Sequence, residues 1–110
     1  MTYASDWPAS APDANPWQGL AGMLTRQDAT GTYQGVIGAA QALTLDQALA
    51  LFTVNGARSL RMEGQTGRLS AGHWADFIVL SSDLRVLRPE EIGAVDVQQT
   101  VWKGRTVYSL

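Results

Sequence analysis

The segment of residues 67–80 constrains the fold most, because the chain changes character there. It reads Gly-Arg-Leu-Ser-Ala-Gly-His-Trp-Ala-Asp-Phe-Ile-Val-Leu, a turn containing two glycines that leads into an apolar strand. The residues before it have helical or loop patterns, whereas those after it are strand-like. We therefore predict an α+β chain with a domain boundary close to this segment.

One carboxylate, Asp76, lies inside the apolar run of this segment. An unpartnered carboxylate is costly to bury, so Asp76 needs hydrogen-bond donors. We interpret it as an acceptor for backbone amides of the turn, in preference to a catalytic group. Gly72 supplies the backbone freedom that a turn ahead of a strand requires.

Composition limits the possible functions. The 110 residues have the size of one small domain, and 45% hydrophobic with 16% charged residues is typical of a globular protein. A net charge of −2 gives no electrostatic reason to expect nucleic acid or an anionic membrane as partner. The absence of cysteine excludes disulfides and thiolate chemistry. No apolar run approaches the ~20 residues of a membrane span, and residues 1–16 lack the features of a secretion signal, so we expect a cytoplasmic protein.

The first half of the chain predicts two helices. Asn15 as N-cap, Pro16 at the first helical position and Gln18 in a capping-box position start the first, which should end near residues 25–26. Thr44 and Gln47 form a second capping box. The apolar stripes are Trp17, Leu20, Ala21 and Leu24 in the first helix, and Leu45, Ala48, Leu49 and Phe52 in the second.

The segments between and after these helices are predicted from their turn residues. Residues 27–41 read as a long loop with at most one turn of helix. Asn55-Gly56 is expected to stop the second helix, and a short helical turn over residues 57–60 should follow. Pro89 opens another helical turn. Finally, two strands over residues 95–102 and 105–108 should form a hairpin around Lys103-Gly104.

The chain has few residues of the types that bind metals or catalyse reactions. A zinc site takes three or four His, Cys or carboxylate ligands, and this chain has one His and no Cys. That residue, His73, lies in a tight turn beside Gly72, and we interpret it as a surface turn residue, not a member of a catalytic triad. We interpret the four tryptophans as packed aromatics, because no basic residues interleave with them as in a nucleic-acid platform.

One candidate site residue, Asp6, stands out by its position. The sequence Ser5-Asp6-Trp7-Pro8 follows a possible strand end at Tyr3 and precedes a proline-rich loop. Catalytic carboxylates of α/β barrels lie at such strand ends. A turn built by the Ser-Asp pair explains the same residues equally well.

Several motifs in order resemble the C-terminal end of a metal-dependent amidohydrolase. The resemblance is to the YtcJ-like amidohydrolase family 3, which includes N-substituted formamide deformylases, and it covers nearly the whole chain. The motifs are Ser5-Asp6-Trp7-Pro8, Asn15-Pro16-Trp17, Thr25-Arg26-Gln27-Asp28, Leu43-Thr44-Leu45-Asp46-Gln47-Ala48-Leu49, Phe52-Thr53-Val54-Asn55-Gly56-Ala57, and the segments 67–80 and 100–108.

For the fold, this resemblance implies a fragment of a larger enzyme. Residues 1–60 would be the end of a TIM-type (β/α)8 barrel, with the end of its last strand, a loop and two helices. Residues 61–110 would be the C-terminal strands of a composite β-sandwich, assembled in such enzymes from the two ends of the chain.

For the site, the resemblance implies specific roles. Asp6 matches the aspartate that ligates the metal and accepts a proton from the attacking water. Trp7 and Pro8 match the loop beside the substrate pocket. The chain departs from the family by having Ala4 where a glycine is usual and His73 where a lysine is frequent. Neither departure removes a metal ligand, but Ala4 bears on how tightly the loop turns.

For function, the resemblance implies hydrolysis of non-peptide C–N amide bonds in a small molecule by a complete enzyme that holds a divalent metal, most often zinc. We expect the isolated chain to bind no metal and to be inactive, because the other ligands are absent. Its partner would be the missing barrel portion or another copy of the chain. Two alternatives remain, namely a stand-alone β-rich module that self-associates or binds another protein, and one chain of a split hydrolase.

Overall fold

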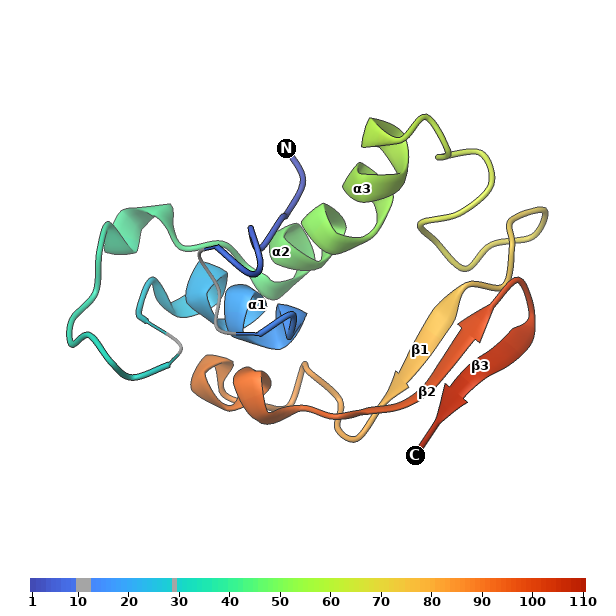
Figure 1. Ribbon diagram of the computed structural model, residues 1–110. Helices are drawn as coiled ribbons and strands as arrows, with labels where there is room; N and C mark the ends of the chain where they lie inside the picture. Colours follow the sequence, from blue (N-terminus) through green and yellow to red (C-terminus); the bar gives the residue numbers. More distant parts are fainter. Residues whose placement is uncertain (10–12, 29) are drawn as a thin grey trace. The chain divides into compact units, whose positions relative to one another are not determined.

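A computed structural model describes residues 1–9, 13–28 and 30–110 (Figure 1). The α-helices precede the strands, and a 3-10 helix lies between the first two strands, which confirms the predicted α+β class. None of the helices in these residues is long and apolar enough to cross a membrane. The elements are α1 (Pro16–Thr25), the 3-10 helix η1 (Ala39–Gln41), α2 (Leu45–Phe52), α3 (Val54–Ser59), β1 (Phe77–Leu80), the 3-10 helix η2 (Pro89–Ala94), β2 (Val97–Trp102) and β3 (Arg105–Ser109).

The chain divides into two compact units, each built from separate stretches of sequence. The sheet unit comprises Met1–Tyr3, Ala50–Asp83 and Asp96–Leu110, and the helix unit comprises Ala4–Leu49 and Leu84–Val95. The division predicted at residue 60 concerns the barrel and sandwich of a larger protein, and it stays a prediction.

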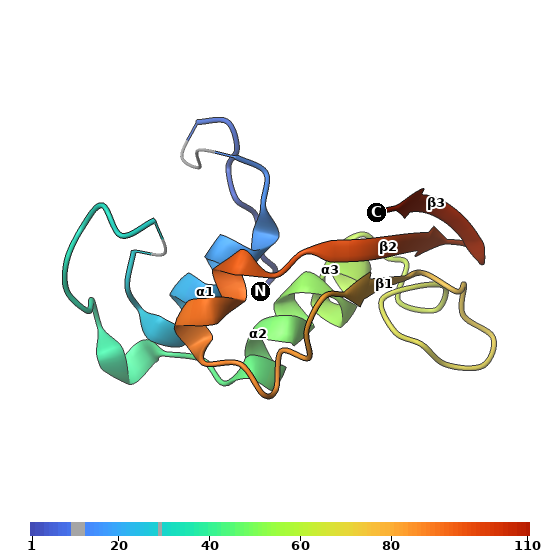
Figure 2. The same cartoon turned by 90° about the horizontal axis from the view of Figure 1, so that it is seen from below.

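The helix unit is built around α1, which packs against η2 (Figure 2). As predicted, the side chain of Asn15 caps α1 by accepting a hydrogen bond from the backbone N–H of Trp17 at 2.9 Å. The prediction for Gln18 is wrong, because the backbone N–H of Asn15 donates to Asp13 at 2.8 Å instead. The buried core of this unit includes Trp17, Leu20, Ala21, Ala48, Leu84, Ile92 and Val95.

The second capping box is present, but the predicted helix end is not. Thr44 and Gln47 exchange backbone-to-side-chain hydrogen bonds of 2.9 and 3.3 Å. The helix breaks at Thr53, with φ −123° and ψ −96°, and Asn55-Gly56 lies inside α3. The physical reason is tertiary packing, since Ala57 is buried in α3 and an added Cβ on Gly67 would lie 2.7 Å from its methyl group.

The sheet unit contains three antiparallel strands in the order β1-β2-β3. Phe77 of β1 pairs with Val101 of β2, and Thr100 of β2 pairs with Tyr108 of β3. Lys103 and Gly104 join β2 and β3 with φ of 50° and 75°, which confirms the hairpin. The second strand begins at Val97 and not at residue 95, because Val95 is buried in the helix unit, where its N–H donates to the carbonyl of Ile92.

The strand end predicted near Tyr3 is absent from residues 1–9. The backbone N–H of Tyr3 donates to the carbonyl of Leu51 at 3.4 Å, and its ring stacks on Phe52 with 4.3 Å between centroids. A parallel barrel strand requires neighbouring strands as hydrogen-bond partners. The assignment of this stretch to a barrel therefore stays a prediction.

Candidate functional site

The predicted site residues Asp6, Trp7 and Pro8 lie together in an exposed turn. The carbonyl of Asp6 accepts a hydrogen bond from the N–H of Ala9 at 2.8 Å, and φ of Asp6 is 55°. The hydroxyl of Ser5 accepts from the N–H of Trp7 at 3.2 Å, and Trp7 is 54% exposed. The Ser-Asp pair thus builds the turn that sequence analysis weighed as an alternative, while its functional role stays a prediction.

The donor set of residues 1–9, 13–28 and 30–110 does not fit a metal ion on its own. Within the part of the chain that the structure describes, no group of three or more His, Asp or Glu side chains is placed to hold one. Asp6 supplies one exposed carboxylate. A metal at this position would need ligands from outside these residues.

The ring and the backbone of His73 are held by hydrogen bonds to neighbouring turn residues. Its Nδ1 lies 2.8 Å from the hydroxyl of Ser70, and its Nε2 lies 3.1 Å from the carbonyl of Glu63. The backbone N–H of His73 also donates to the carbonyl of Ser70 at 3.1 Å. Both ring nitrogens are therefore used to hold the turn, in agreement with the interpretation as a turn residue.

Asp76 connects two turns of the sheet unit. Its Oδ2 accepts a hydrogen bond from the hydroxyl of Thr66 at 2.6 Å, and its Oδ1 accepts from the backbone N–H of Lys103 at 2.7 Å. The Thr66 hydroxyl, followed by the Lys103 amide, holds the pKa of Asp76 below its ordinary value. The Lys103 ammonium in turn lies over the ring of Trp74, 3.8 Å from its centroid. These bonds agree with the structural role predicted for Asp76, but the predicted donors are wrong: the one backbone amide belongs to the β2–β3 turn and the other donor is a side-chain hydroxyl.

A second carboxylate, Asp28, organises part of the loop between α1 and η1. Its Oδ2 accepts from the backbone N–H of Tyr33 at 2.9 Å, and its Oδ1 accepts from the backbone N–H of Thr30 at 3.0 Å. These two amides are the main reason that the pKa of Asp28 lies below its ordinary value. Both oxygens of the Asp28 carboxylate thus accept hydrogen bonds that hold the loop in its conformation.

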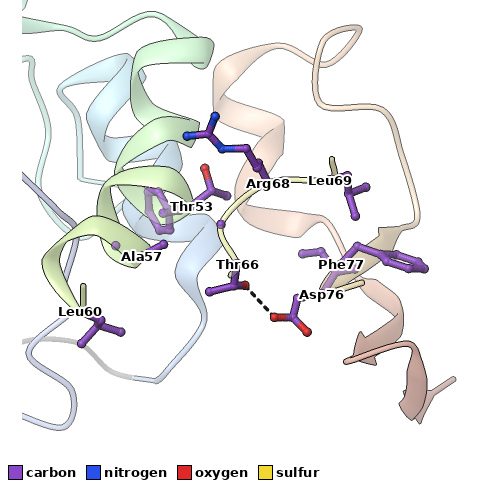
Figure 3. Close-up of a pocket in the computed structure, with 12 residues that line it drawn as sticks. Thr53, Ala57, Leu60, Thr66, Arg68, Leu69, Asp76 and Phe77 are labelled. Atoms are coloured by element: carbon purple, nitrogen blue, oxygen red, sulfur yellow. Dashed lines mark hydrogen bonds between the residues drawn. The ribbon is translucent and has the colours of Figure 1, made fainter. Parts of the chain in front are cut away.

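A pocket of about 520 Å³ lies within the sheet unit, beside α3 and the start of β1 (Figure 3). Its polar residues include Thr53, Thr66, Arg68 and Asp76. No sequence pattern indicates this pocket, because its residues come from three separate stretches, within residues 52–60, 66–69 and 76–78, that meet only in the folded chain. Its larger apolar side chains are Phe52, Leu60, Leu69, Phe77 and Ile78.

Arg68 is the cationic residue of this pocket. Its side chain extends away from Asp76, which is hydrogen-bonded to Thr66 (Figure 3). Among the residues that the structure describes, Arg68 makes no hydrogen bond or ion pair. The guanidinium is therefore available to an anionic group.

Comparison with known proteins supports the family resemblance. Residues 1–108 match a family described as the amidohydrolase family. The chain is 37% identical over 67 residues to imidazolonepropionase of Bradyrhizobium sp., covering 57% of this chain and 16% of that protein. It is 31% identical over 68 residues to the putative amidohydrolase YtcJ of Bacillus subtilis, covering 62% of this chain and 13% of that protein. The chain thus spans about one-sixth or less of the length of these relatives, and no solved structure matches it.

Proposed function

This chain belongs to the amidohydrolase family, and from that premise we propose that it is the C-terminal part of a metal-dependent enzyme that hydrolyses non-peptide C–N bonds. The observation that carries the proposal is the family match over residues 1–108, nearly the whole chain. In the complete enzyme, residues 1–60 would belong to a (β/α)8 barrel and residues 61–110 to a composite β-sandwich. A small-molecule amide would be the substrate.

We assign to Asp6 the roles of metal ligand and of proton acceptor from the attacking water. Asp6 lies in an exposed turn, and Trp7 and Pro8 follow it in the same turn. We assign Trp7 and Pro8 to the loop beside the substrate pocket. The donors within the described residues are too few for a metal, so the remaining ligands would come from the barrel portion. The isolated chain is accordingly proposed to be inactive.

A second candidate function is self-association, or pairing with a separately encoded barrel chain. The observation that favours it is the sheet, in which β1 and β3 each have a single neighbouring strand among the described residues. Ile78 of β1 is 44% exposed, and Tyr108 of β3 is 47% exposed. Unpaired edges with apolar side chains are suited to pairing with another chain.

Metal content tests the first proposal. Elemental mass spectrometry would compare the wild-type chain, Asp6→Ala and Asp96→Ala, each alone and within a longer protein that contains the barrel. We expect no metal on any isolated chain. In the longer protein, Asp6→Ala should lose metal and amide hydrolysis, whereas Asp96→Ala, which removes another exposed carboxylate, should keep both.

Two outcomes would overturn parts of this proposal. Stoichiometric metal on the isolated chain that Asp6→Ala removes would show that the site assembles without the barrel. Unchanged metal content in the longer Asp6→Ala protein would remove Asp6 from the site. Sedimentation of the isolated chain tests the second candidate, since a monomer at all concentrations would exclude self-association.

A further inference from the structure

We propose that the pocket beside α3 binds a small monocarboxylate with an apolar tail, such as an aryl-alkanoate. The pocket lies wholly within the sheet unit, whereas Asp6 belongs to the helix unit. The proposal thus rests on residues other than Asp6, Trp7 and Pro8, to which the hydrolase site is assigned. Its volume of about 520 Å³ falls in the range of ~300–1,000 Å³ that is typical of small-molecule sites.

The apolar tail is inferred from the walls of the pocket. Phe52 and Ala57 line it from the helical side, and Phe77 lines it from β1. Leu60 and Leu69, which also line it, are 71% and 69% exposed, so their aliphatic side chains face solvent. A ligand that covered these side chains would remove apolar surface from water, which favours binding.

The carboxylate is inferred from Arg68. This guanidinium has no hydrogen-bond or ion-pair partner among the described residues, although it lines the pocket. A planar guanidinium matches the two oxygens of a carboxylate. An apolar hollow with one unpartnered arginine thus has the two features that an apolar acid requires.

Asp76 restricts the ligand further. Both of its oxygens accept hydrogen bonds, one from Thr66 and one from Lys103, which fix its negative charge at the wall of the pocket. A second carboxylate on the ligand would be repelled by Asp76, because the Arg68 side chain extends away from that residue (Figure 3). A ligand with a single negative charge and an uncharged tail fits the placement of the positive Arg68 and the negative Asp76.

The test is an NMR titration of the chain with 4-phenylbutyrate, followed by backbone amide shifts. We expect saturable shifts at Gly67, Leu69 and Phe77. Arg68→Gln should weaken binding about tenfold, whereas Arg58→Gln, an exposed arginine of α3 outside the pocket, should leave the Kd unchanged. The neutral 4-phenylbutanamide should also bind about tenfold more weakly than the acid.

Four results would overturn the proposal. The first is no saturation by 4-phenylbutyrate up to about 10 mM. The second is equal affinity of Arg68→Gln and the wild type, with the amide spectrum of the variant showing that it is folded. The third is equal affinity for the acid and its amide, which would indicate apolar contact alone. The fourth is shifts of the same amides on raising protein concentration without ligand, which would make a second copy the occupant.

Discussion

The Oδ1 atom of Asp76 accepts a hydrogen bond of 2.7 Å from the backbone N–H of Lys103, 27 residues later in the chain. Next to it, the N–H of Gly104 donates to the carbonyl of Ala75 at 3.0 Å. The two bonds join the turn that precedes β1 to the turn that connects β2 and β3. The carboxylate that sequence analysis singled out therefore stabilises the sheet from its end.

Removing this carboxylate should destabilise the sheet unit. Asp76→Ala leaves the Lys103 amide and the Thr66 hydroxyl without their acceptor. We expect a lower melting temperature in thermal unfolding followed by circular dichroism. Asp96→Ala removes an exposed carboxylate of the same unit and should melt like the wild type; equal melting of the two variants would contradict the role of Asp76.

The same carboxylate should make stability depend on pH. The pKa of Asp76 is lowered in the folded chain, so its contribution is fully present above the unfolded carboxyl pKa of about 3.9 and is lost as the pH falls through the lower folded pKa. The difference in unfolding free energy between wild type and Asp76→Asn should shrink over this acidic range. Urea unfolding from pH 7 to pH 3 measures it, and a constant difference would argue against the shift.

Gly67 should tolerate no side chain. Its φ is +89°, and an added Cβ would lie 2.7 Å from the Cβ of Ala57. Gly72 has a similar φ of +86° with nothing within 4 Å, so Gly72→Ala measures backbone strain alone. We expect Gly72→Ala to cost about 1–2 kcal/mol and Gly67→Ala to cost about 1–3 kcal/mol more in urea unfolding. Equal costs would show that the Ala57 contact relaxes freely.

The contact between the Lys103 ammonium and the Trp74 ring should make a small contribution to the unfolding free energy. It lies 3.8 Å from the centroid of the Trp74 ring and 5.0 Å from that of Trp102. Lys103→Met keeps an apolar stem but removes the charge, and we expect a loss of about 0.5–1 kcal/mol in unfolding free energy. Lys103→Arg keeps a cation and should lose less; a stability order that places Met above Arg would count against the contact.

The stability of the helix unit should depend strongly on the side chain of one leucine, Leu20. Leu20 of α1 is fully buried, with 0% exposure, whereas Leu60 is 71% exposed. Leu20→Ala should therefore lower the unfolding free energy by about 2–5 kcal/mol through lost burial and a cavity. Leu60→Ala should change it by less than about 0.5 kcal/mol. A small effect of Leu20→Ala would mean that the core around α1 can collapse into the space.

The helix starts and the hairpin were predictable because their signals act over a few residues. The Asn15 side chain bonds the amide two residues on, and Thr44 with Gln47 closes a box three residues long. Lys103 and Gly104 carry the positive φ of the hairpin turn within the turn itself. In each case the partner that decides the structure lies inside the motif.

The errors arose where another residue competes with the predicted structure. Asn55-Gly56 favours a helix end, but these residues remain helical where Ala57 packs beside Gly67. That competition depends on approach distances, which a linear pattern does not contain. Gln18 suits a capping box, but Asp13, two residues before Asn15, takes the same amide, so this second competition is a local one.

The order of motifs along the chain was enough to identify the amidohydrolase family, and the local settings of Asp6 and Asp76 were enough to single out these two carboxylates. The pocket could not be read in that way, because Phe52, Arg68 and Phe77 line it together only after α3, the glycine turn and β1 have packed. Local hydrogen bonds and backbone preferences are encoded within a few neighbouring residues. A cavity and the availability of its arginine are instead properties of long-range packing, and these were decided by the folded chain.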